Sequence, residues 1–420
     1  MAKQFQAPKG VSEYFPPRSA GFEFVRECLV EPAKLAGYQL LELPAFEDTE
    51  LFNRGVGEST DIVTKEMYTF EDRGGRSITL RPEGTAGVMR AVIEHGLDRG
   101  QLPVKVWYAG AFFRAERPQK GRYRQFYQAG IEAIGLTDPL IDAEVISIAD
   151  AGFKRVGLKN YKLLITSLGD AESRAAHKID LMKFLSSQKL DEATAGRAQL
   201  NPLRIFDDKR DEIIDMMAKA PLLIDYLSDE SKEHFISVRQ YLDKLNIKYE
   251  LAPKLVRGFD YYTGTTFEFA HSDLGAQSAI GGGGRYDRLM NELGGQDLSG
   301  IGYGLGIDRV LLAAEAEGIL NADLAAPDLF LIPLDSSNSN DASSLALKVA
   351  NDLRKQGVKV EIAFGDRALK GAMKAADKSG ARYAIVLGET ELNSGLVEIK
   401  AMESGKVEQV RIADLVKFFN

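Results

Sequence analysis

Residues 104–136 read VKVWYAGAFFRAERPQKGRYRQFYQAGIEAIGL, and this stretch predicts the centre of the fold. Two runs rich in β-branched and aromatic residues flank the charged loop AERPQKG, a pattern typical of an antiparallel hairpin. Side chains alternate between the two faces of a strand. We therefore expect one face of the hairpin to carry a defined set of residues: Tyr108, Gly110, Phe112, Arg114, Arg124, Phe126, Gln128, Gly130 and Glu132.

The polar side chains of this face suit a ligand with an anionic part and a cationic or N–H-bearing part. Strand glycines, here Gly110 and Gly130, weaken a strand and often mark the close approach of a ligand. Arginine binds phosphate through paired, charge-assisted hydrogen bonds, and a carboxylate such as that of Glu132 suits an ammonium or an imidazole N–H. A solvated, salt-bridged sheet face is the alternative, and this stretch alone favours neither.

The hairpin loop is basic although the chain as a whole is acidic. Residues 114–124 contain five Lys or Arg residues and one Glu, in a chain of net charge −8. A local basic loop indicates a phosphate-rich partner at one place, whereas the overall charge excludes a general nucleic-acid coat. A solvated turn is the alternative interpretation of the loop.

The composition predicts an ordinary globular chain. Its 420 residues, 45% hydrophobic and 27% charged, predict two or three domains. The single cysteine, Cys28, excludes an internal disulfide. The four histidines lack metal-ligand spacing, so we expect no structural zinc and no metal held by protein side chains alone. No apolar run reaches membrane-spanning length and no signal peptide is visible, so a cytoplasmic location is expected.

The chain before the hairpin predicts a helix over 18–37, a strand within 38–48 and a polar loop over 51–72 whose last residues, MYTFED, are strand-like. The glycines and polar residues of that loop could close over a ligand, or form a plain surface loop: Gly55, Gly57, Glu58, Ser59, Thr60 and Asp61. A strand at 77–81 turns at Pro82 into a helix. Glu83 near the start of that helix could cap it or bind a ligand.

The chain after the hairpin predicts a helix over 138–157, a strand from 161, and a helical insertion over 170–251. The four glycines before Arg285 indicate either close backbone approach to a ligand or a flexible loop. At 300–306, glycine alternates with apolar residues, which leaves one face of a strand bare. That face could accept a flat ring, with Arg309 above it in the next helix. Tight packing of a sheet on a helix is the alternative.

The segment 327–420 predicts a separate α/β domain. Its middle helix carries Lys370, Lys374 and Lys378 four residues apart, so they share a face. This face is a candidate nucleic-acid surface, and a solvated helix face is nearly as good an interpretation.

Six segments together carry a family resemblance. They are RPEGT, GESTDIVTKEMYTF, FRAERPQKGRYRQF, RGFDYYTG with TFEF, GGGGRYD and GLGIDRVLL. They resemble the signatures of class II aminoacyl-tRNA synthetases, and specifically of bacterial histidyl-tRNA synthetases, over essentially the whole chain. The resemblance implies ATP-dependent activation of L-histidine and its transfer to tRNA(His), with ATP as substrate, Mg²⁺ on the pyrophosphate oxygens, and a cytoplasmic homodimer.

The same resemblance implies an α+β fold. A six- or seven-stranded antiparallel sheet with flanking helices would form the catalytic domain from residues 1–169 and 252–322. A helical insertion over 170–251 and a C-terminal α/β anticodon-binding domain over 327–420 would complete the chain.

The resemblance finally implies a role for each site residue. Arg114 and Arg257 would be catalytic and bind the ATP α-phosphate from opposite sides. The ATP-binding residues would be Arg114, Arg122, Arg257, Gly304, Gly306 and Arg309. Histidine would be bound by Glu83, Thr85, Gln128, Glu132, Tyr261, Tyr262 and Arg285. Arg117 and Gln119 would meet the acceptor end of the tRNA, and the helix face described above adds Lys370 and Lys374 as candidates for tRNA binding.

Two non-catalytic classes compete with this interpretation. A synthetase-like regulatory subunit of ATP phosphoribosyltransferase would characteristically lack the C-terminal domain and the catalytic arginines, both of which this sequence contains. An RNA-binding protein that reuses the fold has no need of positioned arginines around a glycine-rich strand. The sequence therefore favours the enzyme.

Overall fold

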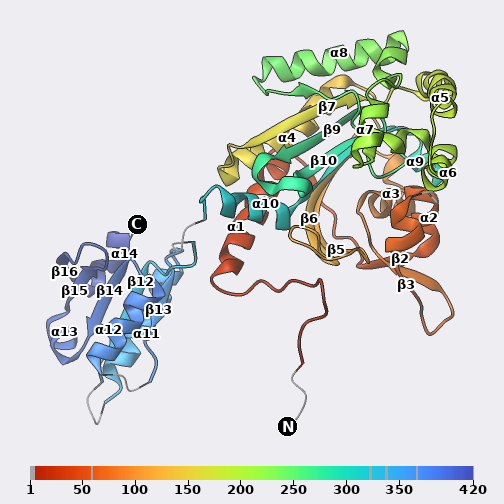
Figure 1. Cartoon of the computed structure of the whole chain (residues 1–420). Helices are drawn as coiled ribbons and strands as arrows, with labels where there is room; N and C mark the ends of the chain where they lie inside the picture. The colour runs from red at the N-terminus through yellow and green to blue at the C-terminus, as the bar shows by residue number, and fades with distance from the viewer. Residues whose placement is uncertain (1–4, 58–59, 321–323, 336–338, 366–367, 420) are drawn as a thin grey trace. The chain divides into compact units, whose positions relative to one another are not determined.

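The chain forms two compact units, Met1–Ile319 (unit 1) and Leu320–Asn420 (unit 2), each of which is considered by itself. The computed structural model describes residues 5–57, 60–320, 324–335, 339–365 and 368–419 (Figure 1). No helix within these ranges is long and apolar enough to cross a lipid bilayer.

Unit 1 is organised around an eight-stranded sheet in the order β1-β5-β6-β11-β10-β9-β7-β8. The six inner strands pair antiparallel, and the edge strands β1 and β8 pair parallel to their neighbours. The strands span Gln39–Leu40 (β1), Val104–Phe113 (β5), Gln125–Ile134 (β6), Tyr161–Ser167 (β7), Glu250–Leu251 (β8), Thr263–His271 (β9), Ala279–Tyr286 (β10) and Gly300–Gly306 (β11). The α+β class is confirmed. The expected six- or seven-stranded antiparallel sheet was wrong in its edges, because two-residue strands are too short to show alternation.

The predicted hairpin is confirmed in both its strands and its face. Gly110 pairs with Gln128, and Tyr108 pairs with Gly130, so these side chains project from one face. The expectation that the two glycines open this face to a ligand is wrong. A Cβ at Gly130 would meet the Tyr108 ring, and one at Gly110 would meet the Arg81 guanidinium. The glycines make room for side chains of the protein itself.

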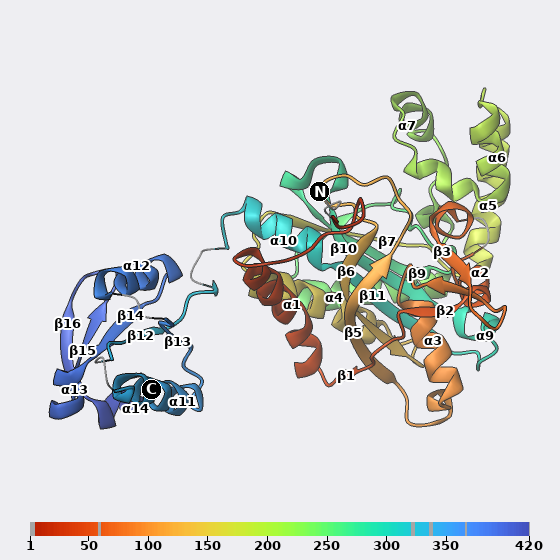
Figure 2. The same ribbon diagram turned by 90° about the horizontal axis from the view of Figure 1, so that it is seen from below.

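Helices α1 (Arg18–Leu35), α4 (Pro139–Val156) and α10 (Ile307–Ala316) lie together beside this sheet, and α4 also packs against α8 (Asp229–Lys244) (Figure 2). Phe153 of α4 packs edge-on against Phe269 of β9, with ring centroids 4.9 Å apart, and both rings are fully buried. Burial of such aromatic surface is the main force that holds helix and sheet together.

A small three-stranded sheet stands beside the main sheet, in the order β2-β4-β3. Its strands and the nearby helices span Phe46–Asp48 (β2), Thr49–Val56 (α2), Ile62–Glu66 (the π-helix η1), Tyr68–Glu71 (β3), Ser77–Leu80 (β4), Thr85–Glu94 (α3) and Leu97–Arg99 (the 3₁₀-helix η2).

The expected loop over 51–72 is wrong in its first part, where α2 and η1 are helical, whereas its expected strand-like end is confirmed as β3. The Asp48 carboxylate caps α2 by accepting from the Glu50 amide at 2.9 Å, and Phe52 and Val56 bury one face of that helix. Glu58 and Ser59 lie outside the described residues.

The predicted helical character of 170–251 is confirmed. It contains α5 (Ala171–Ser186), α6 (Glu192–Leu200), η3 (Pro202–Asp207), α7 (Asp211–Met217), η4 (Leu223–Tyr226) and α8. Helices α5 to α7 share a hydrophobic cluster of their own, which includes Leu181, Ile205 and Met217. The last part instead joins the main body, since α8 packs on α4 and β8 pairs with β7.

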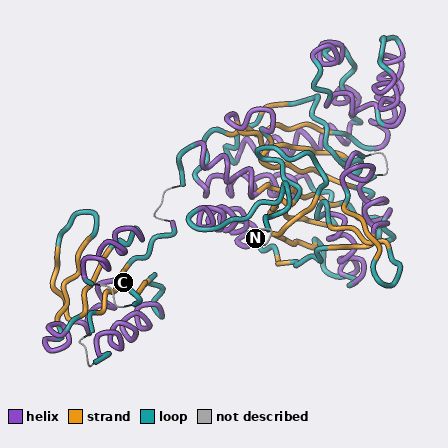
Figure 3. The backbone as a smooth tube through the Cα atoms, turned by 60° about the horizontal axis from the view of Figure 1, so that its bottom comes forward, coloured by secondary structure: helices purple, strands orange, loops and turns teal. Residues whose placement is uncertain are grey.

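Unit 2 is built on a five-stranded sheet in the order β13-β12-β14-β15-β16, with helices beside it (Figure 3). Its elements span Leu329–Pro333 (β12), Asp341–Arg354 (α11), Val360–Ile362 (β13), Leu369–Ser379 (α12), Tyr383–Leu387 (β14), Glu389–Ser394 (α13), Leu396–Ala401 (β15), Val407–Arg411 (β16) and Leu415–Phe419 (α14). Strands β13, β12 and β14 are parallel, whereas β15 and β16 are antiparallel. The predicted α/β character of this segment is confirmed.

Candidate active site

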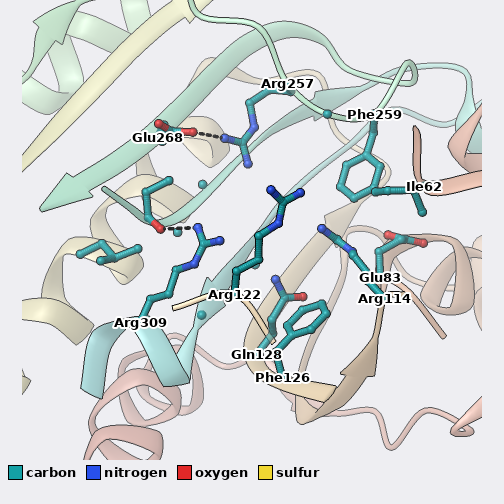
Figure 4. A pocket seen from close by; sticks show the side chains of 18 of the residues that line it. Ile62, Glu83, Arg114, Arg122, Phe126, Gln128, Arg257, Phe259, Glu268 and Arg309 are labelled. Atoms are coloured by element: carbon teal, nitrogen blue, oxygen red, sulfur yellow. Dashed lines mark hydrogen bonds and ion pairs between the residues drawn. The ribbon is translucent and has the colours of Figure 1, made fainter. Parts of the chain in front are cut away.

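A cavity of about 360 Å³ in unit 1 is lined by four arginines from four different segments (Figure 4). Arg114 follows β5 and Arg122 lies in the hairpin loop. Arg257 lies in the loop before β9, and Arg309 lies in the first turn of α10. Eleven residues predicted from the sequence line this cavity: Glu83, Thr85, Arg114, Arg122, Gln128, Arg257, Tyr261, Tyr262, Gly304, Gly306 and Arg309.

Two of these arginines are paired with carboxylates that also line the cavity. Arg257 Nη1 donates to Glu268 Oε2 at 2.7 Å, and Arg122 forms an ion pair with Glu116. Arg257 Nε is buried and has no hydrogen-bond partner among the described residues.

The other two arginines are held by main-chain carbonyls. Arg114 Nε donates to Pro82 O at 3.0 Å, and its guanidinium carbon lies 5.1 Å from the centre of the Phe126 ring. Arg309 donates to Gly121 O at 2.7 Å and to Ala279 O at 2.8 Å. These contacts fix the direction in which each guanidinium points.

The cavity is unfavourable for the arginines when no anion is present. Burial lowers the pKa of Arg114. Burial also lowers the pKa of Arg309, and the charges of Arg114 and Arg122 lower it further. An anionic ligand would relieve both effects, because opposite charges are attracted strongly where water is excluded.

Glu83 has the capping geometry considered from the sequence. Its carboxylate accepts from the amides of Thr85 at 2.7 Å and Ala86 at 2.8 Å, the first two of α3. Burial raises the pKa of Glu83, and the two backbone hydrogen bonds oppose that shift. The same carboxylate lines the cavity, so capping fixes its position beside any ligand.

Glu132 lies behind the cavity and is not among the residues that line it. Its side chain is buried and accepts three hydrogen bonds, from Thr85 Oγ1 at 2.8 Å, Tyr108 OH at 3.3 Å and Tyr286 OH at 2.5 Å. Burial raises the pKa of Glu132 to about 8, against these hydrogen bonds. Thr85 and Tyr108 line the cavity and connect Glu132 to it.

Arg285 is not brought to the cavity. Its guanidinium forms an ion pair with Asp142 of α4 and donates to Leu136 O at 2.9 Å. The four glycines before it form part of β10 rather than a flexible loop, so Arg285 and Tyr286 point to opposite faces. Tyr286, whose hydroxyl donates to Glu132, lies on the face of β10 that is turned toward the site.

The alternating glycines of β11 are confirmed as a strand with one bare face, but most of that face is covered. A Cβ at Gly300 would meet the Tyr286 ring, and one at Gly302 would meet the Glu132 carboxylate. A Cβ at Gly304 would lie 3.4 Å from the Gln128 amide nitrogen. Gly304 and Gly306 both line the cavity. Space for a flat ring is therefore confined to the end of β11 next to Arg309.

The residues predicted to bind tRNA lie outside the cavity. Arg117 and Gln119 are exposed in the hairpin loop, and Lys370 and Lys374 are exposed on α12 of unit 2.

Functional candidates that were missed include Glu268 and Phe259, which line the cavity, and Tyr286, which donates to Glu132 behind it. Strand alternation could have indicated Glu268, because Phe267 and Phe269 on either side of it are fully buried on the other face.

Fold and site together are those of a class II aminoacyl-tRNA synthetase. The family model for histidyl-tRNA synthetase matches residues 10–310, and the model for an anticodon binding domain matches residues 328–420. The chain belongs to the histidyl-tRNA synthetase family.

Relatives extend this assignment over both units. The histidine–tRNA ligases of Saccharopolyspora erythraea and Rhodococcus erythropolis are each 58% identical to this chain, over 98% and 99% of its length and 97% of theirs. The crystal structure of apo Staphylococcus aureus histidyl-tRNA synthetase matches with a TM-score of 0.79 and 36% identity, over 99% of this chain and 100% of that one. These similarities support catalytic tRNA charging over the regulatory-subunit alternative.

Proposed function

We propose that the chain joins L-histidine to tRNA(His) at the cavity of unit 1. Histidine first reacts with ATP to give histidyl-adenylate and pyrophosphate, and the histidyl group then passes to the 3′ end of the tRNA. The observation that carries this proposal is the convergence of four arginines on one cavity that also contains the Glu83 carboxylate. Such a site suits a polyphosphate beside an ammonium group.

In the first step, a carboxylate oxygen of histidine attacks the α-phosphorus of ATP. A new oxygen–phosphorus bond forms, and the bond to the pyrophosphate leaving group breaks. The carboxylate is already ionised at neutral pH, so no general base is required. Arg114 and Arg257 stabilise the charge on the non-bridging oxygens, while Arg122 and Arg309 bind the rest of the triphosphate.

Histidine lies between α3 and the hairpin in this proposal. Glu83 binds its ammonium group, with Thr85 and Gln128 beside it. Tyr261, Tyr262 and the group of hydroxyls around Glu132 recognise the imidazole. Arg285 contributes indirectly, because Asp142 holds its guanidinium and the adjacent Tyr286 contacts Glu132.

The family uses ATP together with Mg²⁺. The described residues contain no group of three His, Cys, Asp or Glu side chains that could hold a metal by themselves. Mg²⁺ usually requires only one or two carboxylates plus substrate phosphates. Glu268 and Glu116 line the cavity and would hold Mg²⁺, which would supply positive charge to the pyrophosphate leaving group.

The tRNA contacts more than one part of the chain in this proposal. Arg117 and Gln119 meet the acceptor end, and Lys370 and Lys374 meet the anticodon arm.

Residues 1–169 and 252–322 form the catalytic domain, 170–251 the insertion and 327–420 the anticodon-binding domain. The chain works as a cytoplasmic homodimer.

Replacing Lys374 by alanine should weaken tRNA(His) binding and lower the slope of log affinity against log salt concentration by about 1, because one phosphate contact is lost. Histidine activation without tRNA should be unchanged. Filter binding at several salt concentrations measures the slope. Lys348→Ala, which removes an exposed lysine from α11, is the matched control. Equal slopes for both variants would contradict the assignment of the α12 face.

The test of the function is ATP–pyrophosphate exchange with each standard amino acid, without tRNA. Exchange driven by histidine alone is the expected result. Protein that is folded and dimeric but exchanges with no amino acid would overturn the proposal in favour of a regulatory or binding role.

A further inference from the structure

The loop between β8 and β9, residues 252–262, carries Arg257 and is held largely by contacts outside the main sheet. The structure describes every residue of this loop, and none of them belongs to a helix or strand. The Phe259 ring stacks on that of Tyr261, with centroids 5.2 Å apart, and lies 5.7 Å from the Arg114 guanidinium (Figure 4). The position of this one loop therefore affects both arginines assigned to the α-phosphate.

Two side chains of the helical insertion bind this loop directly. Arg204 of η3 donates to Gly258 O at 2.9 Å and to Asp260 Oδ1 at 3.0 Å. Asn201, which precedes η3, donates to the same Asp260 oxygen at 2.8 Å. Arg204 and Asp260 are only 20% and 26% exposed, so water screens their ion pair incompletely.

The two points of contact flank Phe259 and lie next to Arg257. A single terminal nitrogen of Arg204, Nη2, joins a main-chain carbonyl to a carboxylate two residues further on. That geometry fixes the direction of the backbone as well as its location. The attachment is also close to the reaction, because Asp207 at the end of η3 lines the cavity itself.

Asp260 also contacts the residues at the end of α2. A Cβ at Gly57 would come within 2.8 Å of the Asp260 carboxylate, and the Asp260 amide donates to Val56 O at 3.4 Å. The loop with Arg257 is thus held between α2 and the insertion.

We propose that the insertion positions the loop that carries Arg257, and that Arg204 and Asn201 are positioning residues for adenylate formation. The inference rests on the proposed function, in particular on the action of Arg257 at the α-phosphate. Arg204 does not touch the reacting atoms. It sets the distance from Arg257 to them, and a misplacement of about 1 Å at a reacting centre lowers a rate on the order of 100-fold.

The experiment compares Arg204→Ala with the matched control Arg210→Ala. Arg210 also lies in the insertion, but its hydrogen bonds go to Asp191, Thr194 and Asp208 of the insertion itself. The rate of histidyl-adenylate formation is measured in a single turnover at saturating ATP and histidine. Arg204→Ala should be slower than the unchanged chain by roughly 10- to 100-fold, and Arg210→Ala should remain within about twofold of it.

A double-mutant cycle separates positioning from a general disturbance of the fold. If Arg204 acts through Arg257, then Arg204→Ala should add little to the loss already caused by Arg257→Ala. Asn201→Ala should show the same dependence. Arg204→Lys should recover part of the rate, since its ammonium keeps the charge and can donate to both oxygens but lacks the rigid plane of the guanidinium.

The outcomes separate this inference from the proposed function. Additive losses in the cycle, equal losses in Arg204→Ala and Arg210→Ala, or no loss in Arg204→Ala would each overturn the inference alone. An Arg257→Ala variant that forms adenylate at the unchanged rate would overturn the proposed role of Arg257, and the inference with it. Melting temperatures of all variants identify any loss that comes from partial unfolding.

Discussion

Arg257→Ala should slow histidyl-adenylate formation by about 100- to 1000-fold while histidine still binds with nearly unchanged affinity. The figure is typical of removing one fixed donor from the place where negative charge develops in a transition state. Arg257 is suited to that role because it lines the cavity and Glu268 holds one end of its guanidinium.

The measurement is single-turnover adenylation with separate determination of histidine affinity. Arg257→Lys should be intermediate, because an ammonium retains the charge but not the planar fork. Arg257→His should resemble Arg257→Ala at alkaline pH, where imidazole is neutral. Arg239→Ala removes the same charge from α8, at a residue that does not line the cavity, and serves as the control. Adenylation at the unchanged rate in Arg257→Ala would disprove the assigned role.

Glu132→Gln should weaken the selection of histidine over amino acids of similar shape by roughly 10- to 100-fold, as expected when a buried hydrogen-bonding pocket loses its arrangement of donors and acceptors. In the structure, the hydroxyls of Thr85, Tyr108 and Tyr286 all donate toward Glu132. Thr85 and Tyr108 therefore present lone pairs to the cavity. Either carboxyl oxygen can accept a hydrogen bond, whether or not the group is protonated, but the amide nitrogen of a glutamine cannot, so Glu132→Gln breaks or reverses at least one of these bonds.

The selectivity is measured as the ratio of kcat/KM in pyrophosphate exchange for histidine and for analogues with another five-membered ring. Tyr286→Phe removes one donor to Glu132 at a residue that does not line the cavity, and it should have a smaller effect. An unchanged ratio in Glu132→Gln would contradict this account of recognition.

The raised pKa of Glu132 predicts that the unchanged chain and Glu132→Gln differ in how their stability depends on pH. The folded chain holds a proton on Glu132 up to about pH 8, whereas the unfolded chain releases it near pH 4.3, as an ordinary glutamate does. Between these values the folded state binds one more proton, so stability falls as pH rises, by about 1.4 kcal/mol per pH unit from this group. Glu132→Gln lacks this contribution. Between pH 5 and pH 8, the free energy of unfolding of the unchanged chain should therefore fall relative to that of Glu132→Gln. Urea denaturation at several pH values measures this difference.

The sequence predicted those parts of the fold whose signal is local. The hairpin of β5 and β6 was predicted because both strands alternate over ten residues and their turn lies between them. Helix α2 was missed because it is short and contains Gly55 and Asn53, which also suit a loop. The order of strands depends on pairings such as that of β6 with β11, which are remote in the sequence and leave no local pattern.

Predicted residues that lie in sequence motifs mostly line one cavity, whereas a prediction that depends on which face of a strand meets the cavity was less accurate. Alternation alone does not say which face of β10 meets the cavity, so Arg285 was chosen where Tyr286 faces the site. Composition likewise does not reveal what fills the space above a strand glycine. At Gly130 that space is filled by Tyr108, which is nearby only once the hairpin is folded.

The pairing of β6 with β11 also determines when the sheet can be completed during synthesis. Asp308 accepts from the Tyr127 amide, and 181 residues of chain separate them. A ribosome adds about 5–20 residues per second, so this edge of β6 emerges roughly 10–40 seconds before its partner. An unpaired edge of this kind is a template for aggregation. Slower translation lengthens the interval, and a chain truncated before residue 300 never closes it.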